Sequence, residues 1–261
     1  MMYQFCALTD PGRARDNNED SVAYEEQARL AVLADGMGGY NAGEIASGMA
    51  TAFIKSELSR WLLEVGASAP AKEVRRAMEI CVDNANTAIF NSANSNASYA
   101  GMGTTLVVGV FRDDRLLLGH IGDSRCYRLR GGHLTQITKD HSLLQEQIDA
   151  GLITPEQAQG SSIKNLVTRA LGVEDIVALD VNEHAVEPND LYLMCSDGLS
   201  DMVNDEVIAR ILAEDAGLAL KAEMLIATAN DEGGRDNISV LIVAVGDAME
   251  RKGLFARLLG K

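Results

Sequence analysis

Basic residues are scarce in this chain of 261 residues. It has 23 lysines and arginines against 38 aspartates and glutamates, which gives a formal net charge of −15. Nucleic acids and anionic membranes bind basic surfaces, which release counterions or meet lipid headgroups, so neither is an expected partner. An ordinary acidic surface explains most of the excess negative charge. A cluster of carboxylates that binds cations is the second explanation.

Cysteine and proline are rare as well, with four of each. The cysteines form no short pair such as Cys-x-x-Cys, and each lies in an apolar or alternating segment typical of a protein core. Four buried thiols predict a reducing compartment. We find neither a signal-peptide pattern nor an apolar run of about 18 residues, so we expect a cytoplasmic location and no stable membrane insertion. The cysteines are Cys6, Cys81, Cys126 and Cys195.

No proline- or serine-rich linker divides the chain, and 47% of its residues are hydrophobic, enough for a substantial core. We therefore expect one domain over residues 1–246. The tail, residues 247–261, mixes apolar with basic residues. This pattern is typical of an amphipathic helix that docks on the domain or, in the second interpretation, anchors the protein to a membrane or a partner.

The hydrophobic spacing predicts both strands and helices. Strands are predicted over residues 3–8, 29–34, 104–111, 115–121, 125–130, 133–137, 176–186, 190–195 and 238–245. Helices are predicted over residues 43–65, 71–95, 205–213 and 218–229. Short connections such as Arg112-Asp113-Asp114 favour antiparallel hairpins. Clustered strands and clustered helices indicate an α+β fold in which helix pairs cover a sandwich of sheets.

Two predicted strands end in Asp-Gly. Leu30 to Ala34 is followed by Asp35-Gly36, and Leu191 to Cys195 by Ser196-Asp197-Gly198. Carboxylates at one end of a buried sheet suit a hard divalent cation. One Asp-Gly usually marks only a turn, but gathered carboxylates repel and raise one another's pKa values unless Mg²⁺ or Mn²⁺ neutralises them. The acidic residues in such loop-like contexts are Glu19, Asp20, Asp35, Asp123, Asp197 and Asp236.

These residues belong to a longer series of ordered motifs. The series is Asp10-x-Gly-x-x-Arg15, Asn18-Glu19-Asp20, Asp35-Gly-Met-Gly-Gly, Gly43-Glu44, Gly103-Thr104-Thr105, Gly122-Asp123-Ser124-Arg125, Asp140-His141-Ser142, Ser196-Asp197-Gly198 and Arg235-Asp236-Asn237. In this order and spacing, the chain from Tyr3 to Val245 resembles the bacterial metal-dependent serine/threonine phosphatases, protein phosphatase type 2C. The resemblance implies a four-layer αββα sandwich, with two mainly antiparallel sheets between helix pairs. It also implies hydrolysis of phosphoserine and phosphothreonine on proteins.

The resemblance further implies two core metal ions, Mg²⁺ or Mn²⁺. Asp35 would bridge both ions. The Gly36 carbonyl and Glu19 would bind one ion, whereas Asp197 and Asp236 would bind the other. A water shared between two cations becomes a hydroxide nucleophile near neutral pH, so no phosphoenzyme is expected.

Three further positions take roles from the same resemblance. Asp20 would reach the site through water. Asp123 matches the ligand of a weaker third ion, to which Asp197 would also contribute. Arg15 resembles the phosphate clamp of the family, and its planar fork suits two phosphoryl oxygens better than a lysine would.

The sequence departs from the family pattern next to Asp35. Many bacterial relatives have a histidine where this chain has Tyr40, and eukaryotic relatives have one where Met37 stands. The usual histidine for protonating the leaving oxygen is therefore absent. Because the unperturbed pKa of tyrosine is about 10, Tyr40 is a weak acid at neutral pH, and a metal-bound water is the alternative donor. We hypothesise that this change slows turnover; a Tyr40→His variant with unchanged rate and pH profile would contradict it.

The histidines are expected to have mainly structural roles. His141 either orients a loop near the metals or caps the helix that begins at Ser142, and capping and loop structure is the preferred interpretation. The remaining histidines, in strand-like segments, are His120, His133 and His184.

A segment of about residues 142–172 is expected to form small helices around an insertion. The resemblance implies that it corresponds to the flap beside the active site of the family, the region expected to set substrate choice. Arg13 and Arg169 are candidates for steering a phosphopeptide, although exposed arginines are usually only solvated. By analogy with bacterial relatives, the expected partners are a cognate serine/threonine kinase and the proteins that it phosphorylates. We expect a monomer.

Two other classes of function fit part of the pattern. A non-catalytic phosphoprotein-binding module would keep the fold, but it has little reason to keep a full set of carboxylates together with Arg15. A two-metal nuclease would also use clustered carboxylates, but its need for a basic path fits poorly with a net charge of −15. The sequence identifies neither the substrates nor the metal used in the cell.

Overall fold

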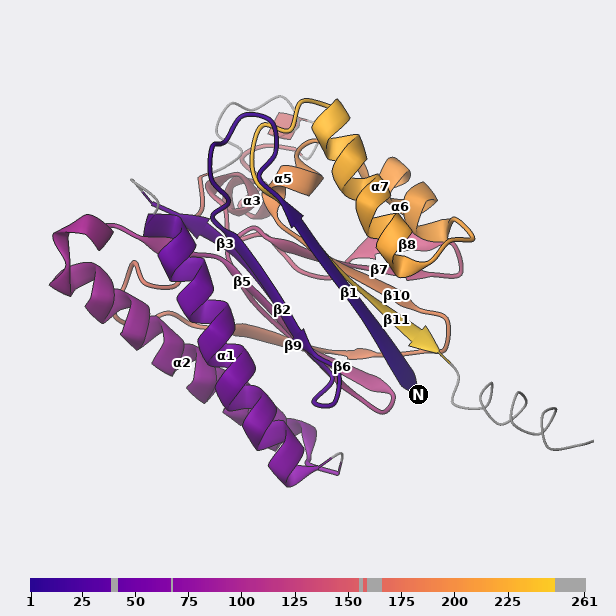
Figure 1. The fold of residues 1–261 in the computed structure, drawn as a ribbon, viewed down its shortest axis with the longest axis horizontal. Coiled ribbons are helices and arrows are strands. Elements are labelled where there is room, and N and C mark those ends of the chain that lie inside the picture. Colours follow the sequence, from indigo (N-terminus) through magenta and orange to yellow (C-terminus); the bar gives the residue numbers. More distant parts are fainter. Residues whose placement is uncertain (39–41, 67, 155–156, 159–165, 247–261) are drawn as a thin grey trace, which may run out of the picture.

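Two antiparallel β-sheets packed face to face, with helices on both outer sides, make up the structure (Figure 1). It is a computed structural model that describes residues 1–38, 42–66, 68–154, 157–158 and 166–246. The order helix, sheet, sheet, helix confirms the predicted α+β fold with four layers.

The strands follow the predicted antiparallel pattern. The first sheet has the order β1-β11-β10-β7-β8, and the second has the order β2-β3-β5-β6-β9, with β4 paired to β3. The first consists of β1 (Met2–Asp10), β7 (Arg125–Arg130), β8 (His133–Gln136), β10 (Leu191–Cys195) and β11 (Ile238–Gly246). The second consists of β2 (Asp20–Glu25), β3 (Leu30–Met37), β4 (Gly103–Thr104), β5 (Leu106–Arg112), β6 (Arg115–Ile121) and β9 (Asp180–Ala185).

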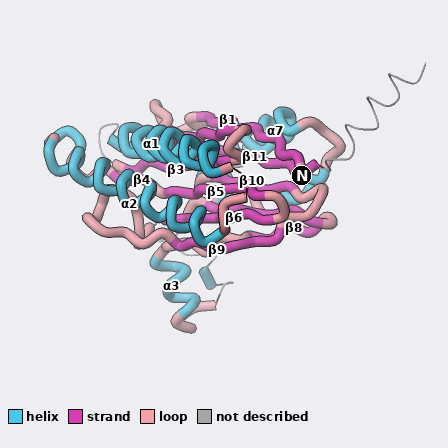
Figure 2. The backbone as a smooth tube through the Cα atoms, turned by 90° about the horizontal axis from the view of Figure 1, so that it is seen from below, coloured by secondary structure: helices cyan, strands magenta, loops and turns pink. Residues whose placement is uncertain are grey.

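Each sheet carries its own helices. Helices α1 (Ala42–Val65) and α2 (Ala71–Ser95) pack on the second sheet, and the 3₁₀ helix η1 (Ala97–Tyr99) follows α2. The helices of the first sheet are α5 (Asp197–Ser200), α6 (Asp205–Ala213) and α7 (Leu218–Asp231). Figure 2 shows α3 (Leu143–Asp149) projecting out of the layers.

The surroundings of β3 explain its continuous apolar run from Leu30 to Ala34. Leu30, Val32 and Ala34 pack against the layer of α1 and α2. Ala31 and Leu33 point to the opposite face, into the core between the two sheets. Because successive side chains of a strand alternate between faces, a strand buried on both faces must be apolar at every position. The run ends at Asp35, where the strand reaches the edge of the layers and a polar cavity begins.

Three predictions about local structure were wrong. Strand β2 was not predicted, because it is an edge strand of mostly half-buried residues with little apolar signal. The strand predicted over residues 176–186 is shorter, since only Asp180–Ala185 pairs with β6, and Ile176 is 79% exposed. Asp35 and Asp197 do not lie in loops: Asp35 is inside β3, and Asp197 begins α5.

Parts of the predicted flap and the whole tail lie outside the described residues, at 155–156, 159–165 and 247–261. The limits of the phosphatase domain, the flap and the amphipathic tail therefore stay predictions. Among the helices that the structure does describe, none has the length and apolar character needed to cross a bilayer.

Candidate active site

One cavity at the ends of several strands collects nearly all the predicted site residues. Its volume is about 350 Å³. It is lined by Arg15, Asn17, Glu19, Asp35, Gly36, Met37, Gly38, Thr105, Asp123, Val167, Asp197, Asp236 and Asn237. Of the residues predicted to bind metal or phosphate, only Asp20 is missing from this lining. Residues separated by more than 200 positions in the chain thus meet in one small volume.

Strand pairing places Asp20 behind Asp35. The two residues are direct partners in the antiparallel register of β2 and β3. The backbone of Asp35 is fixed from the other side: its N–H donates to Thr105 Oγ1 at 3.0 Å, and its carbonyl accepts from Thr105 N and Thr104 Oγ1, each at 2.9 Å. The backbone of Asp35 is therefore held between β2 on one side and Thr104 and Thr105 on the other.

Asp20 is only 8% exposed. One of its carboxylate oxygens has a hydrogen-bond partner and the other has none among the described residues. Its Oδ2 accepts a hydrogen bond from Ser196 Oγ at 2.8 Å, and Ser196 Oγ accepts in turn from Ser239 N at 2.9 Å. Its Oδ1 is buried and has no hydrogen-bond partner among the described residues. A buried carboxylate oxygen without a partner is costly, so this atom fits a position next to a cation or an ordered water.

Asn237 ties together the segments that carry the ligands. Its Oδ1 accepts from the backbone N–H of Glu19 at 2.8 Å, and its Nδ2 donates to the carbonyls of Pro11 at 3.0 Å and Asn17 at 2.8 Å. Because it follows Asp236 directly, these bonds hold Asp236 beside the loop of Glu19. The side chain uses its acceptor and both of its amide protons.

The glycines of the motifs make room for this convergence. A Cβ on Gly43 would lie 2.3 Å from Glu19 Oε2, which is closer than any side chain tolerates. A Cβ on Gly36 would lie 2.2 Å from the carbonyl oxygen of Gly43. The start of α1 can therefore approach β3 and the Glu19 carboxylate only because both positions lack a side chain.

The clustered carboxylates are electrostatically frustrated. Burial raises the pKa of Asp20 to about 6, and burial followed by the charge of Asp140 raises the pKa of Asp123 to about 6. Burial raises the pKa of Asp35 well above its usual value, and the charge of Asp20 raises it further. The pKa of Asp197 is raised for the same two kinds of reason, with Asp123 as the first neighbour. A cluster that stays charged at neutral pH needs added positive charge, which hard divalent cations supply.

Arg15 is the cationic side chain in the lining of the cavity. Its Nη2 donates to Asp236 Oδ2 at 2.8 Å, and its side chain is 52% exposed. An exposed ion pair of this kind adds little stability, so it neither compensates the deeper carboxylates nor anchors the fold. Its position suits an anion that enters from solvent.

Several functional positions were quoted in the motifs without receiving a role. They are Thr105, Ser196 and Asn237, and their hydrogen bonds hold Asp35, Asp20 and Glu19. The signal was present, since each stands in or next to a ligand motif. Their hydrogen-bond partners could not be identified from the sequence, because they lie 70, 176 and 218 positions away along the chain.

The other predicted residues have separate outcomes. Met37 lines the cavity, whereas Tyr40 lies outside the described residues. Arg13 and Arg169 are not part of the lining. The Nη1 atom of Arg169 lies 3.5 Å from Asp180 Oδ1. Ser142 caps α3 through a hydrogen bond from Gln145 N to its Oγ, so capping is not the work of the His141 side chain.

A second cavity, of about 760 Å³, shares Asp123 and Asp197 with the first. Part of its wall is formed by Leu144, Gln145 and Ile148, from the segment predicted as the flap. The described part of this segment therefore lies beside the carboxylate cluster.

Comparison with known proteins agrees with this arrangement. The family model described as protein phosphatase 2C matches residues 13–227. The serine/threonine phosphatase stp of Listeria innocua is 37% identical over 238 residues, which cover 90% of this chain and 93% of the relative.

Solved structures show the same similarity. The crystal structure of the Mycobacterium tuberculosis serine/threonine phosphatase PstP/Ppp matches with a TM-score of 0.86 and 39% identity, over 95% of this chain and 100% of that one. The catalytic domain of PstP in complex with two manganese ions matches with a TM-score of 0.82 and 40% identity, over 94% of this chain and 99% of that one.

Proposed function

The chain belongs to the protein phosphatase 2C family and is a metal-dependent serine/threonine protein phosphatase, and we propose the roles of its residues in that reaction. The observation that carries the proposal is the convergence of the predicted ligands and Arg15 on one cavity of about 350 Å³. The reaction is hydrolysis of phosphoserine and phosphothreonine on proteins.

Asp35 would contact both core ions. Glu19 and the Gly36 carbonyl would hold one ion, and Asp197 and Asp236 would hold the other. When bound, two divalent ions lower the pKa of a water that they share and so supply a nucleophile at neutral pH. The lining supports this assignment because it offers carboxylate and carbonyl oxygens, which Mg²⁺ and Mn²⁺ prefer. The choice between the two ions is left to measurement.

Asp20 and Asp123 act at the margin of this centre. Asp20 stands behind Asp35, and its unsatisfied Oδ1 supports a contact through an ordered water. Asp123 lines both cavities together with Asp197, which supports a weaker third ion between them.

Arg15 binds the phosphoryl group of the substrate. Its half-exposed guanidinium lines the cavity with one NH₂ group on Asp236, so it is oriented before substrate arrives. A planar guanidinium binds two phosphoryl oxygens at once, which positions phosphorus beside the carboxylate cluster. We assign no side chain as the acid that protonates the leaving oxygen. The Tyr40→His variant tests the hypothesis that turnover is slow.

The substrates are, by analogy with bacterial relatives, proteins phosphorylated by a cognate serine/threonine kinase, and the enzyme acts as a monomer. A reducing compartment such as the cytoplasm is supported by four cysteines that form no disulfide among the described residues. The phosphatase domain is assigned to residues 1–246, with the flap at about 142–172 and a separate tail.

The test is phosphate release from a phosphothreonine peptide. We expect activity with Mn²⁺, none with EDTA, and almost none in Asp197→Asn. Asp114→Asn is the matched control, because it removes the same charge at an exposed turn between β5 and β6. Activity that survives chelation would exclude the metal mechanism. No activity with either metal, combined with phosphopeptide binding, would instead favour the non-catalytic binding module.

A further inference from the structure

His141 makes contacts to two separate segments of the active-site wall. Its backbone N–H donates to the carbonyl of Gly122 at 2.9 Å, and its own carbonyl accepts from Thr168 N at 2.9 Å. Gly122 precedes Asp123, and Thr168 follows Val167; both Asp123 and Val167 line the catalytic cavity. His141 therefore connects two parts of that lining that are more than 40 positions apart in the chain.

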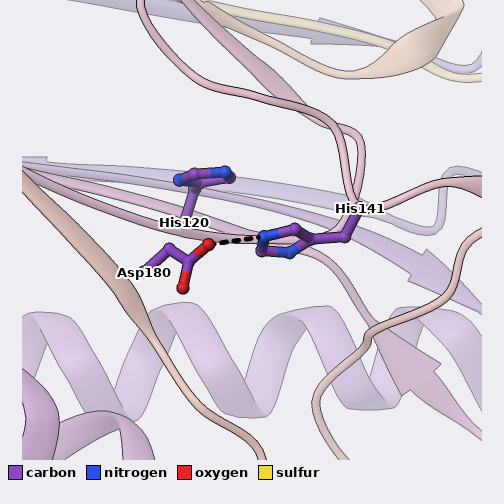
Figure 3. Close-up of side chains that lie close together, drawn as sticks. All are labelled: His120, His141 and Asp180. Carbon is purple, nitrogen blue, oxygen red and sulfur yellow. Dashed lines mark hydrogen bonds and ion pairs between the residues drawn. The ribbon is translucent and has the colours of Figure 1, made fainter. Parts of the chain in front are cut away.

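The hydrogen bonds of the imidazole fix its tautomer. The backbone N–H of Gly122 donates to Nδ1 at 3.1 Å, so Nδ1 carries no proton. The neutral ring then has its proton on Nε2, which lies 2.9 Å from Asp180 Oδ2 and donates to it (Figure 3). Asp180, on β9, thereby selects the tautomer in which Nδ1 can accept from Gly122.

The surroundings keep the ring neutral and flat against its neighbour. His141 is buried, and its ring stacks on that of His120 with centroids 4.7 Å apart and an angle of 17° between the planes. Burial lowers the pKa of His141, against the opposing effect of the hydrogen bond to Asp180. The other charged or titratable groups that face it are His120 and Arg169, both of which lower this pKa.

The same three side chains resemble a metal site, because one ligand atom from each of His120, His141 and Asp180 lies within 4.8 Å of the others. The hydrogen bonds argue against this use. A metal on Nε2 of His141 would move the ring proton to Nδ1, where it would face the N–H of Gly122. His120 is also engaged, since its Nε2 lies 2.8 Å from the carbonyl of Lys139 and donates to it.

We propose that His141 is a positioning residue that holds the turn of Gly122 and Asp123 against the segment of Val167 and Thr168, with Asp180 fixing its tautomer. Gly122 has a φ of +98° and is buried, so its N–H needs a partner inside the protein. Without the Nδ1 acceptor the turn must shift, and Asp123 shifts with it. The effect on a metal ion rests on the proposed function, because it requires Asp123 to bind the weaker ion.

Two amide variants distinguish the roles of the two ring nitrogens of His141. In His141→Asn the side-chain oxygen can take the place of Nδ1, whereas in His141→Gln the amide group can take the place of Nε2 and the acceptor for Gly122 is lost. We expect His141→Gln to speed hydrogen exchange of the Gly122 amide and to weaken binding of the weakest Mn²⁺ ion, by calorimetry, about tenfold. His141→Asn should stay close to the wild type in both measurements.

Nuclear magnetic resonance of the metal-free wild type tests the tautomer directly, and we expect the Nε2–H form at neutral pH. If His141→Gln does not fold, Asp180→Ala replaces it, because Asp180 is 47% exposed and its loss should mix the two tautomers and weaken protection of the Gly122 amide. The Nδ1–H form in the wild type would overturn the proposal, as would equal behaviour of the Asn and Gln variants. Zn²⁺ binding to the His120 and His141 rings, abolished by Asp180→Ala, would show a metal site instead.

Failure of the proposed function would look different. Asp35→Asn should remove activity and leave protection of the Gly122 amide unchanged, because that amide depends on His141 and not on the core ions. A wild-type protein that releases no phosphate but shows the Nε2–H tautomer and a protected Gly122 amide would contradict the phosphatase assignment while keeping the positioning role.

Discussion

Asp190 and the aspartates around the catalytic cavity differ in how their charges are balanced. Asp190, which is 1% exposed, accepts hydrogen bonds from Arg130 Nε and Nη2, both at 2.7 Å, from Glu187 N at 2.9 Å and from the Tyr192 hydroxyl at 3.1 Å. Although burial acts to raise the pKa of Asp190, these donors lower it below its usual value.

The net pKa shifts of Asp20, Asp35, Asp123 and Asp197 have the opposite direction. Burial and neighbouring negative charge raise the pKa values of Asp20, Asp35, Asp123 and Asp197. The fold thus lowers the pKa of one buried carboxylate and raises those of the others, at the place where cations are expected. We infer that Asp190 serves stability and that the cavity aspartates serve binding, at a cost to the metal-free protein.

The strongest test of this contrast is Asp35→Asn. We expect phosphate release to fall by roughly a thousandfold or more, because the residue proposed to contact both core ions loses its charge. In EDTA the same variant should unfold at a higher temperature than the wild type, since a neutral amide removes the repulsion from Asp20. Thermal unfolding with and without EDTA measures this, and a variant that is less stable in EDTA would break the contrast.

The opposite result is expected for Asp190→Asn. Loss of the charge that pairs with Arg130 should lower the free energy of unfolding by about 2 kcal/mol, less than for a fully buried pair because Arg130 is partly exposed and keeps Glu187 as a partner. Denaturant unfolding measures the change. Phosphate release per folded molecule should be unaltered at saturating Mn²⁺, and a loss of activity would show that Asp190 is more than structural.

A second arginine–aspartate pair sharpens the contrast. The side chains of Arg15 and Asp236 are 52% and 34% exposed, so Arg15→Ala should change stability little. We expect it to raise KM for a phosphopeptide about tenfold, with a smaller effect on kcat, because the arginine is proposed to bind the phosphoryl group. Arg15→Lys should be intermediate, since it keeps the charge and loses the planar fork. An unchanged KM in both variants would remove Arg15 from the site.

The smallest expected effect is the pH dependence of the stability of the metal-free protein. The folded-state pKa values of Asp20 and Asp123 are raised from about 4 to about 6, so the folded metal-free protein binds more protons than the unfolded chain in this range. Its stability should therefore fall as the pH rises from 4 through 6. Asp190, whose pKa is lowered, contributes the opposite slope only at lower pH. Melting temperatures in EDTA should show the fall, and saturating Mn²⁺ should abolish it.

Much of this fold could be predicted because its strongest signals are local. The helix predicted over residues 71–95 is α2 without a change of boundary, and that over 205–213 is α6. The edge strand β2 was missed because its pairing with β3, and not its own composition, makes it a strand. Asp197 was placed in a loop because a single short turn of helix leaves almost no periodic pattern.

For the site, the identities of the acidic residues and Arg15 followed from their motifs. Their supports did not: Thr105, Ser196 and Asn237 hold ligands through hydrogen bonds that cross between distant segments. His141 shows the same limit, since its interpretation as a cap gave way to bonds with Gly122 and Asp180.

By itself the sequence determined the chemistry, because the kinds of side chain in the motifs, and the glycines beside them, are what a hard cation and a phosphoryl group require. Only the tertiary structure decided which carboxylates have raised pKa values and which atoms hold them in place. Electrostatic frustration and long-range hydrogen bonds depend on burial and strand register, and these exist only after the two sheets have packed together.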